Sequence, residues 1–101
     1  MVFIYTTCAT SEEAERLGKL ILEQKLGACI DYWPIHSMYN WKGEYKKISE
    51  MMLIIATFES KLETVNDLIS NHHSYSTPLI AGVDVRRINR AYKEWMMEEV
   101  V

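Results

Sequence analysis

The chain has 101 residues, 49% of them hydrophobic, and a formal net charge of -3. This composition is too apolar for a disordered chain, and the length predicts one small domain over residues 1–101. The acidic balance disfavours nucleic-acid binding, because phosphate contacts need clustered Lys and Arg. No apolar run is long enough to span a bilayer. Because no basic segment precedes Val2-Phe3-Ile4, we expect no signal peptide and a cytoplasmic protein.

The first quarter of the chain predicts a strand followed by a helix. Residues 2–7 are β-branched and aromatic, which favours a buried strand. Ser11 is a suitable N-cap for an amphipathic helix over residues 11–26, and Gly27 is a suitable C-cap. Gly18 lies on the apolar side of this helix, so we expect the sheet to approach closely there.

A long hairpin is predicted next. Residues 28–41 read as a strand in which Pro34 marks an edge or a bulge, and Lys42-Gly43 forms the turn. The return strand ends in a continuous apolar run over residues 51–57, which indicates burial on both faces. The tip would project beyond the body of so small a domain, and its aromatic flanks would need a partner surface.

The second half predicts a helix, a strand and a last helix. Ser60 with Glu63 forms a capping box, and that helix ends near residues 71–73. A strand over residues 79–85 follows, and an apolar stripe runs from Ile88 to Met96. The order is that of an α+β, ferredoxin-like split β-α-β-β-α-β fold with a C-terminal helix. We expect the helices to cover one sheet face and leave the other uncovered.

The segment between the second helix and the fourth strand is the strongest functional signal. His72 and His73 are neighbouring imidazoles, the commonest side chains offered to transition metals, but histidines also favour helix C-termini. Tyr75 is expected to pack with its hydroxyl bonded at a subunit edge. Thr77-Pro78 predicts a rigid entry into the strand.

Cys8 and Cys29 are the only cysteines, which excludes a disulfide framework. Cys29 is expected in the core, although its thiolate would suit copper(I). Trp41 with Gly43 favours hairpin and interface architecture over a ligand site. The third strand lacks the stacking aromatics of RNA-binding relatives of this fold, so we expect self-association into a closed symmetric oligomer.

Seven blocks in this order resemble the CutA family, the divalent-cation tolerance proteins. They are Tyr5-Thr6-Thr7-Cys8, Ser11-Glu12-Glu13-Ala14, Lys25-Leu26-Gly27-Ala28-Cys29, Ser37-Met38-Tyr39-Asn40-Trp41-Lys42-Gly43-Glu44, Leu53-Ile54-Ile55-Ala56-Thr57, His72-His73-Ser74-Tyr75-Ser76-Thr77-Pro78 and Tyr92-Lys93-Glu94-Trp95. The resemblance implies a homotrimer formed through the long hairpin. It also implies a cytoplasmic protein that binds copper or other divalent cations and is linked to metal tolerance. It implies no catalytic activity.

The metal site of the resembled family is only partly present. Its histidine corresponds to His72, but Leu79 stands at its glutamate position and Thr6 at its cysteine position, with Cys8 two residues on. Ala56 replaces a frequent lysine, and Asp84 a frequent proline. We therefore predict His72, His73 and Cys8 as the metal ligands. The residues predicted at the trimer interface or cleft are Cys29, Tyr39, Trp41 and Tyr75. The alternative is a trimeric scaffold or small-molecule sensor that resembles the PII proteins in topology and lacks a functional metal site.

Overall fold

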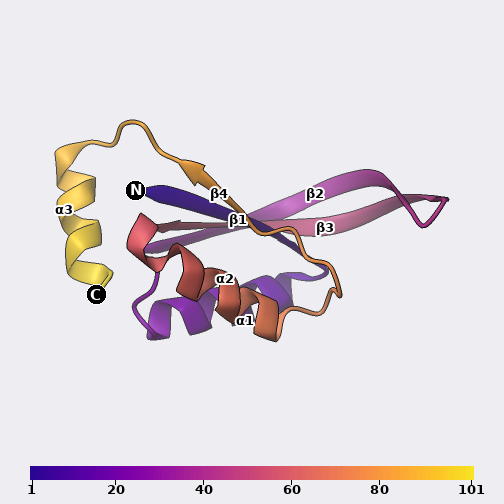
Figure 1. Ribbon diagram of the computed structural model, residues 1–101, viewed down its shortest axis with the longest axis horizontal. Helices are drawn as coiled ribbons and strands as arrows, with labels where there is room; N and C mark the ends of the chain where they lie inside the picture. Colours follow the sequence, from indigo (N-terminus) through magenta and orange to yellow (C-terminus); the bar gives the residue numbers. More distant parts are fainter.

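The computed structural model describes residues 1–101 and contains one four-stranded sheet with three α-helices (Figure 1). In chain order the elements are β1 Val2–Cys8, α1 Ser11–Glu23, β2 Cys29–Trp41, β3 Glu44–Thr57, a short 3₁₀ turn Glu59–Lys61, α2 Leu62–His72, β4 Ala81–Asp84 and α3 Arg90–Glu99. The strands are antiparallel in the order β2-β3-β1-β4. This order confirms the predicted ferredoxin-like α+β fold.

Helices α1 and α2 lie against one face of the sheet, where the main core forms. Alternate residues of β1 point into this core because successive strand side chains face opposite sides. The members of the core are Val2, Ile4, Cys8, Ala14, Leu17, Ile21, Leu26, Leu53, Ile55, Val65, Leu68 and Ile69. A Cβ added at Gly18 would lie 2.9 Å from the Ile30 side chain, so α1 approaches the sheet as closely as predicted.

The second face of the sheet is partly covered by α3, so the expectation of a fully uncovered face is wrong. Met96 and Val100 pack with Ala28 and Ala56 at the end of the sheet away from the hairpin (Figure 1). Cys29 is half-buried beside this second cluster. Beyond α3 the face remains open toward the hairpin.

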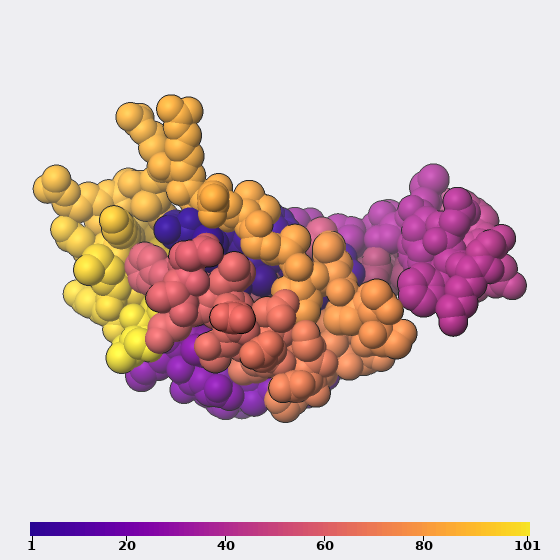
Figure 2. Space-filling model, in the orientation of Figure 1, coloured from indigo at the N-terminus to yellow at the C-terminus, as the bar shows by residue number.

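Strands β2 and β3 form the long hairpin, whose tip stands clear of the body of the molecule (Figure 2). The molecule accordingly measures 46 × 25 × 21 Å. Lys42 and Gly43 make the turn with positive φ angles of 50° and 81°. Pro34 lies in β2, which is an edge strand, and its pairing continues without a bulge. The predicted projection of the tip is therefore confirmed.

Several predicted boundaries are wrong by a few residues. Helix α1 is capped by Thr10 instead of Ser11 and ends at Glu23; Lys25, with φ 56°, takes the left-handed position predicted for Gly27. Ser60 does not cap α2, because the 3₁₀ turn precedes that helix. Strand β4 is shorter than residues 79–85, and α3 begins after Ile88. None of the helices combines the length and the apolar character needed to cross a membrane.

Candidate functional site

Three potential metal ligands meet where β1, α1 and the end of α2 converge. They are Cys8, the last residue of β1, Glu13, in the first turn of α1, and His73, directly after α2. One ligand atom from each lies within 4.8 Å of the other two. Cys8 and the His73 ring are fully buried, and Glu13 is 6% exposed. We call these residues the buried cluster.

Helix capping places Glu13 in the buried cluster. Thr10 Oγ1 accepts a hydrogen bond from the Glu13 backbone N–H, and Glu13 Oε1 accepts one from the Ala9 N–H. This reciprocal pattern is a variant of the capping box, in which the bonded backbone group lies one residue before the cap. Because Ser11 was the predicted N-cap, Glu13 was not predicted as a site residue. The Thr-x-x-Glu spacing from Thr10 was the signal that could have found it.

The Glu13 carboxylate also holds the loop that follows α2. Ser74 donates to it twice, from its backbone N to Oε2 at 2.7 Å and from its hydroxyl to Oε1 at 2.9 Å. Burial opposes ionisation of this carboxyl, but the hydrogen bonds from Ala9 and Ser74, aided by His73, lower its pKa below the usual value. Glu13 is therefore an ionised, hydrogen-bonded carboxylate at neutral pH.

Hydrogen bonds assign the tautomer of His73. Its Nε2 lies 2.9 Å from the Thr7 carbonyl oxygen, which can only accept, so Nε2 carries a proton. Its Nδ1 accepts the backbone N–H of Tyr75 at 3.0 Å and is therefore unprotonated. A metal ion bound to Nδ1 would have to displace this Tyr75 N–H.

Cys8 completes the cluster as a thiol. Burial, together with the charge of Glu13, raises its pKa from 9.0 to about 12. The thiolate is the form that binds metals, so binding at Cys8 would release a proton. Thiolate, imidazole and carboxylate together are a ligand set used for zinc and copper.

His72 lies apart from the buried cluster. It is the last residue of α2 and is exposed, and its carbonyl oxygen accepts a hydrogen bond from Arg16 Nη2 at 3.1 Å. Leu79, at the glutamate position of the resembled family, is exposed on the open side of the sheet. The structure thus brings together two of the three predicted ligands, Cys8 and His73, and adds Glu13.

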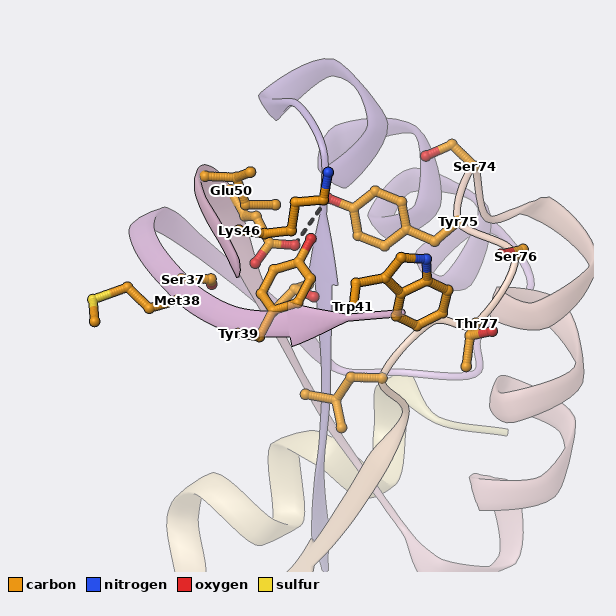
Figure 3. A pocket seen from close by; sticks show the side chains of 13 residues that line it. Ser37, Met38, Tyr39, Trp41, Lys46, Glu50, Ser74, Tyr75, Ser76 and Thr77 are labelled. Atoms are coloured by element: carbon orange, nitrogen blue, oxygen red, sulfur yellow. Dashed lines mark hydrogen bonds between the residues drawn. The ribbon is translucent and has the colours of Figure 1, made fainter. Parts of the chain in front are cut away.

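A cavity of about 680 Å³ lies on the open sheet face, between the hairpin and the loop after α2 (Figure 3). Its lining residues are Thr7, Ser37, Met38, Tyr39, Trp41, Lys46, Ile48, Glu50, Ser74, Tyr75, Ser76, Thr77 and Leu79. Three of the residues predicted for the interface or cleft, Tyr39, Trp41 and Tyr75, therefore share this cavity. Cys29 is not among its lining residues and packs near α3 instead.

Glu50 is a polar residue of the cavity that the sequence analysis missed. It is 7% exposed, and its Oε1 accepts a hydrogen bond from the Tyr75 hydroxyl at 2.8 Å, drawn as a dashed line in Figure 3. Burial and the bond to Glu50 raise the pKa of Tyr75 above its usual value, so the phenol stays protonated. The only sequence signal was a carboxylate directly before the apolar run of residues 51–57.

Three consecutive residues connect the two regions. His73 and Ser74 bond to the Thr7 carbonyl and to Glu13 on the helix side, whereas Tyr75 reaches Glu50 in the cavity. The Tyr75 backbone N–H bonds back to the His73 ring. Hydrogen bonds therefore link the helix side of this loop to the cavity through His73 and Tyr75.

Comparison with known proteins identifies relatives over nearly the whole chain. The family model of the CutA1 divalent ion tolerance protein matches residues 2–99. The divalent-cation tolerance protein CutA of Archaeoglobus fulgidus is 38% identical over 98 residues, which cover 97% of this chain and 96% of that protein. The solved structure of the periplasmic divalent cation tolerance protein CutA from Archaeoglobus fulgidus superposes with a TM-score of 0.97 at 37% identity, covering all of both chains.

A second solved structure adds a functional comparison. The PII-like protein CutA from Nostoc sp. PCC 7120, in apo form, superposes with a TM-score of 0.92 at 27% identity, covering 100% of this chain and 98% of that one. The matches to the family model and to full-length relatives agree in extent with the fold described above. The chain therefore belongs to the CutA1 divalent ion tolerance protein family.

Proposed function

We propose that this protein is a trimeric, cytoplasmic divalent-cation-binding protein that acts in metal tolerance by binding and not by catalysis. The names of its relatives support the link to divalent cations. The observation that carries the proposal is the convergence of Cys8, Glu13 and His73, whose ligand atoms lie within 4.8 Å of one another. We propose this buried cluster as the cation site, with copper or zinc as the ions that suit it.

The roles of the three side chains follow from their chemistry. Cys8 would lose its proton and bind as thiolate, and Glu13 is already ionised by its hydrogen bonds. His73 would bind through Nδ1 while Nε2–H stays on the Thr7 carbonyl, an outer hydrogen bond of the kind that orients metal-bound imidazoles. Binding is therefore expected to strengthen as the pH rises, because one proton leaves with the thiol.

Calorimetric titration of zinc(II), and anaerobically of copper(II), into metal-free protein tests this site. Cys8→Ala and His73→Ala should each weaken binding tenfold or more, whereas His72→Ala, the matched neighbouring imidazole, should leave it unchanged. Equal affinity in all three variants would reject the buried cluster as the site. Because buried variants can unfold, the wild type is also titrated in buffers of different ionisation enthalpy. Failure to release about one proton per ion bound would exclude Cys8.

The trimer is supported by the exposed aromatic flanks of the hairpin. In the single chain, each of three large aromatic side chains is at least 40% exposed: Tyr39, Trp41 and Tyr45. Exposure of several large apolar side chains in one region is typical of a surface that another chain covers. Trp41→Glu is expected to lower the mass measured by light scattering from trimer toward monomer. Lys42→Glu, one residue on, is the matched charge control. A Trp41→Glu protein that stays trimeric would contradict this interface.

A small-molecule sensor of the PII type is the second candidate. The specific observation is the polar and aromatic cavity beside the hairpin, together with the likeness to the PII-like protein of Nostoc. A thermal-shift screen of nucleotides and small anions distinguishes the two functions. Stabilisation by such a compound, without a response to zinc(II) or copper(II), would favour the sensor.

A further inference from the structure

A thioether side chain lies beside the buried cluster. Met51 of β3 is the register partner of Cys8, the last residue of β1. Directly opposed residues of antiparallel strands point to the same face of the sheet, with their Cβ atoms about 4.5–5.5 Å apart. Cys8 belongs to the main core, and Met51 packs against that core. The Met51 side chain therefore lies on the helix-covered face, next to the Cys8 thiol.

The neighbouring methionine faces the other side of the sheet. Met52 pairs with Thr7, and successive strand residues alternate between the two faces. Met51 is only partly buried, whereas Cys8 and the ring of His73 are fully buried. Met51 is thus a partly exposed sulfur donor beside a buried thiol and a buried imidazole.

The Glu13 carboxylate is already engaged by the backbone and by Ser74. Its Oε1 accepts hydrogen bonds from the Ala9 N–H and the Ser74 hydroxyl, and its Oε2 accepts one from the Ser74 N–H. An ion bound to Glu13 would compete with these bonds. Zinc is almost always held by four ligands in closed protein sites. Without Glu13, the site offers only sulfur and nitrogen donors and falls short of that number.

The charge of the site favours a monovalent ion. The thiolate is the form that binds metals, so one proton leaves Cys8 when an ion arrives. Replacement of this proton by copper(I) leaves the net charge of the buried cluster unchanged. Zinc(II) or copper(II) would add one positive charge, and uncompensated charge is costly in a buried site. The negative charge of Glu13 already lies 3.7 Å from Arg16.

We propose that the buried cluster binds copper(I) in preference to zinc(II), with the Met51 thioether as a third ligand beside the Cys8 thiolate and His73 Nδ1. Thiolate and thioether sulfurs are the protein ligands that select copper(I). Glu13 keeps its hydrogen bonds and holds the loop that carries His73. This inference rests on the proposed cation site and names the ion that the site selects.

Competition with bicinchoninate under anaerobic, reducing conditions measures the copper(I) affinity, and competition with a chromophoric chelator measures the zinc(II) affinity. Met51→Leu keeps an apolar side chain of similar volume and removes the sulfur. It should weaken copper(I) binding at least about tenfold, a loss typical even of an outer-shell partner, and leave zinc(II) binding unchanged. Met52→Leu, on the opposite sheet face, is the matched control and should change neither affinity.

X-ray absorption at the selenium edge provides a direct readout of the bond. In selenomethionine-labelled protein loaded with copper(I), the selenium spectrum should show a copper neighbour. Met51→Leu should remove this neighbour, and Met52→Leu should retain it. A spectrum without a copper neighbour in the labelled wild type would overturn the proposal without reference to any variant.

Failure of this inference can be distinguished from failure of the proposed cation site. Copper(I) binding that needs Cys8 and His73 but is unaffected by Met51→Leu would overturn the inference and leave the site standing. Equal weakening of copper(I) and zinc(II) by Met51→Leu, or tighter binding of zinc(II) by the wild type, would also overturn it. Binding of neither ion, or binding that is insensitive to Cys8→Ala, would reject the site together with the inference.

Discussion

Glu13 and Glu50 are both buried carboxylates and lie on opposite sides of the same loop, but they differ in their hydrogen-bond partners. Glu13 receives three hydrogen bonds, and its Oε2 lies 3.7 Å from Arg16 Nη2 and 3.8 Å from Nδ1 of the His73 ring. Glu50 receives one hydrogen bond, from Tyr75, and has no cationic partner. The difference shows that burial alone does not define a role. Hydrogen bonds fix both oxygens of Glu13, whereas only Oε1 of Glu50 is hydrogen-bonded.

The largest effect is expected at Glu13. Glu13→Gln replaces one acceptor oxygen by a donor group facing donors from Ala9 and Ser74, and should lower the free energy of unfolding by about 2–4 kcal/mol. Denaturant unfolding measures this. Glu12→Gln, exposed on the same turn, should change it by less than about 0.5 kcal/mol. Equal effects of the two substitutions would contradict the described role of Glu13.

The same substitution has an expected pH dependence. Because the folded-state pKa of Glu13 is below the unfolded value, its stabilisation is present above the unfolded pKa and is lost as the pH falls through the folded pKa. The stability gap between wild type and Glu13→Gln should therefore narrow in acid. A gap that stays constant down to strongly acidic pH would show that the carboxylate charge is irrelevant.

A smaller loss is expected when the bond to Glu50 is removed. Tyr75→Phe deletes the hydroxyl donor and should lower the free energy of unfolding by about 1.5–3 kcal/mol, the range for hydrogen bonds to charged groups. Tyr45→Phe, whose ring is 64% exposed on the hairpin, is the matched control and should be nearly neutral. A neutral Tyr75→Phe would mean that Glu50 is already well solvated, which would sharpen its contrast with Glu13.

Cys8 should make the buried cluster sensitive to alkali. Its folded-state pKa, about 12, exceeds the ordinary value of 9.0, so the folded protein keeps a proton that the unfolded chain releases. The stabilisation is complete below pH 9.0 and is lost as the pH rises toward 12. Unfolding measurements should show a slope of up to roughly 1.4 kcal/mol per pH unit for this group. Cys8→Ala should unfold with a shallower slope, and an unchanged slope would assign the effect to other groups.

The smallest effect is expected at His72. Its ring is exposed at the end of α2, so His72→Ala should change the free energy of unfolding by less than about 0.5 kcal/mol. His73→Ala removes hydrogen bonds to the Thr7 carbonyl and the Tyr75 N–H and should cost about 2 kcal/mol or more. Thermal unfolding compares the two neighbours directly. Similar thermal midpoints for His72→Ala and His73→Ala would contradict the different contacts described for the two histidines.

Strand and helix order followed from local patterns. Alternation and apolar runs predicted the strands, and the Lys42-Gly43 turn predicted the hairpin. Boundaries were less predictable, because neighbouring polar residues compete as caps. Thr10 and Ser11 are both good N-caps, and in the structure Thr10 caps α1 through its bond with the Glu13 N–H, while the Glu13 carboxylate bonds to Ala9. The cover of α3 over Ala56 could not be predicted, because an amphipathic stripe does not say which face receives it.

The sequence by itself determined the element order, the ferredoxin-like topology, the projecting hairpin and the importance of the segment from His72 to Pro78. These depend on periodicity and turn chemistry between near neighbours in the chain. Only the tertiary structure decided that His73, and not His72, faces Cys8, that Glu13 joins them, and that Glu50 meets Tyr75. These contacts between residues far apart in the sequence depend on helix phase and strand register. A shift of one residue in either moves a side chain from the core to the solvent.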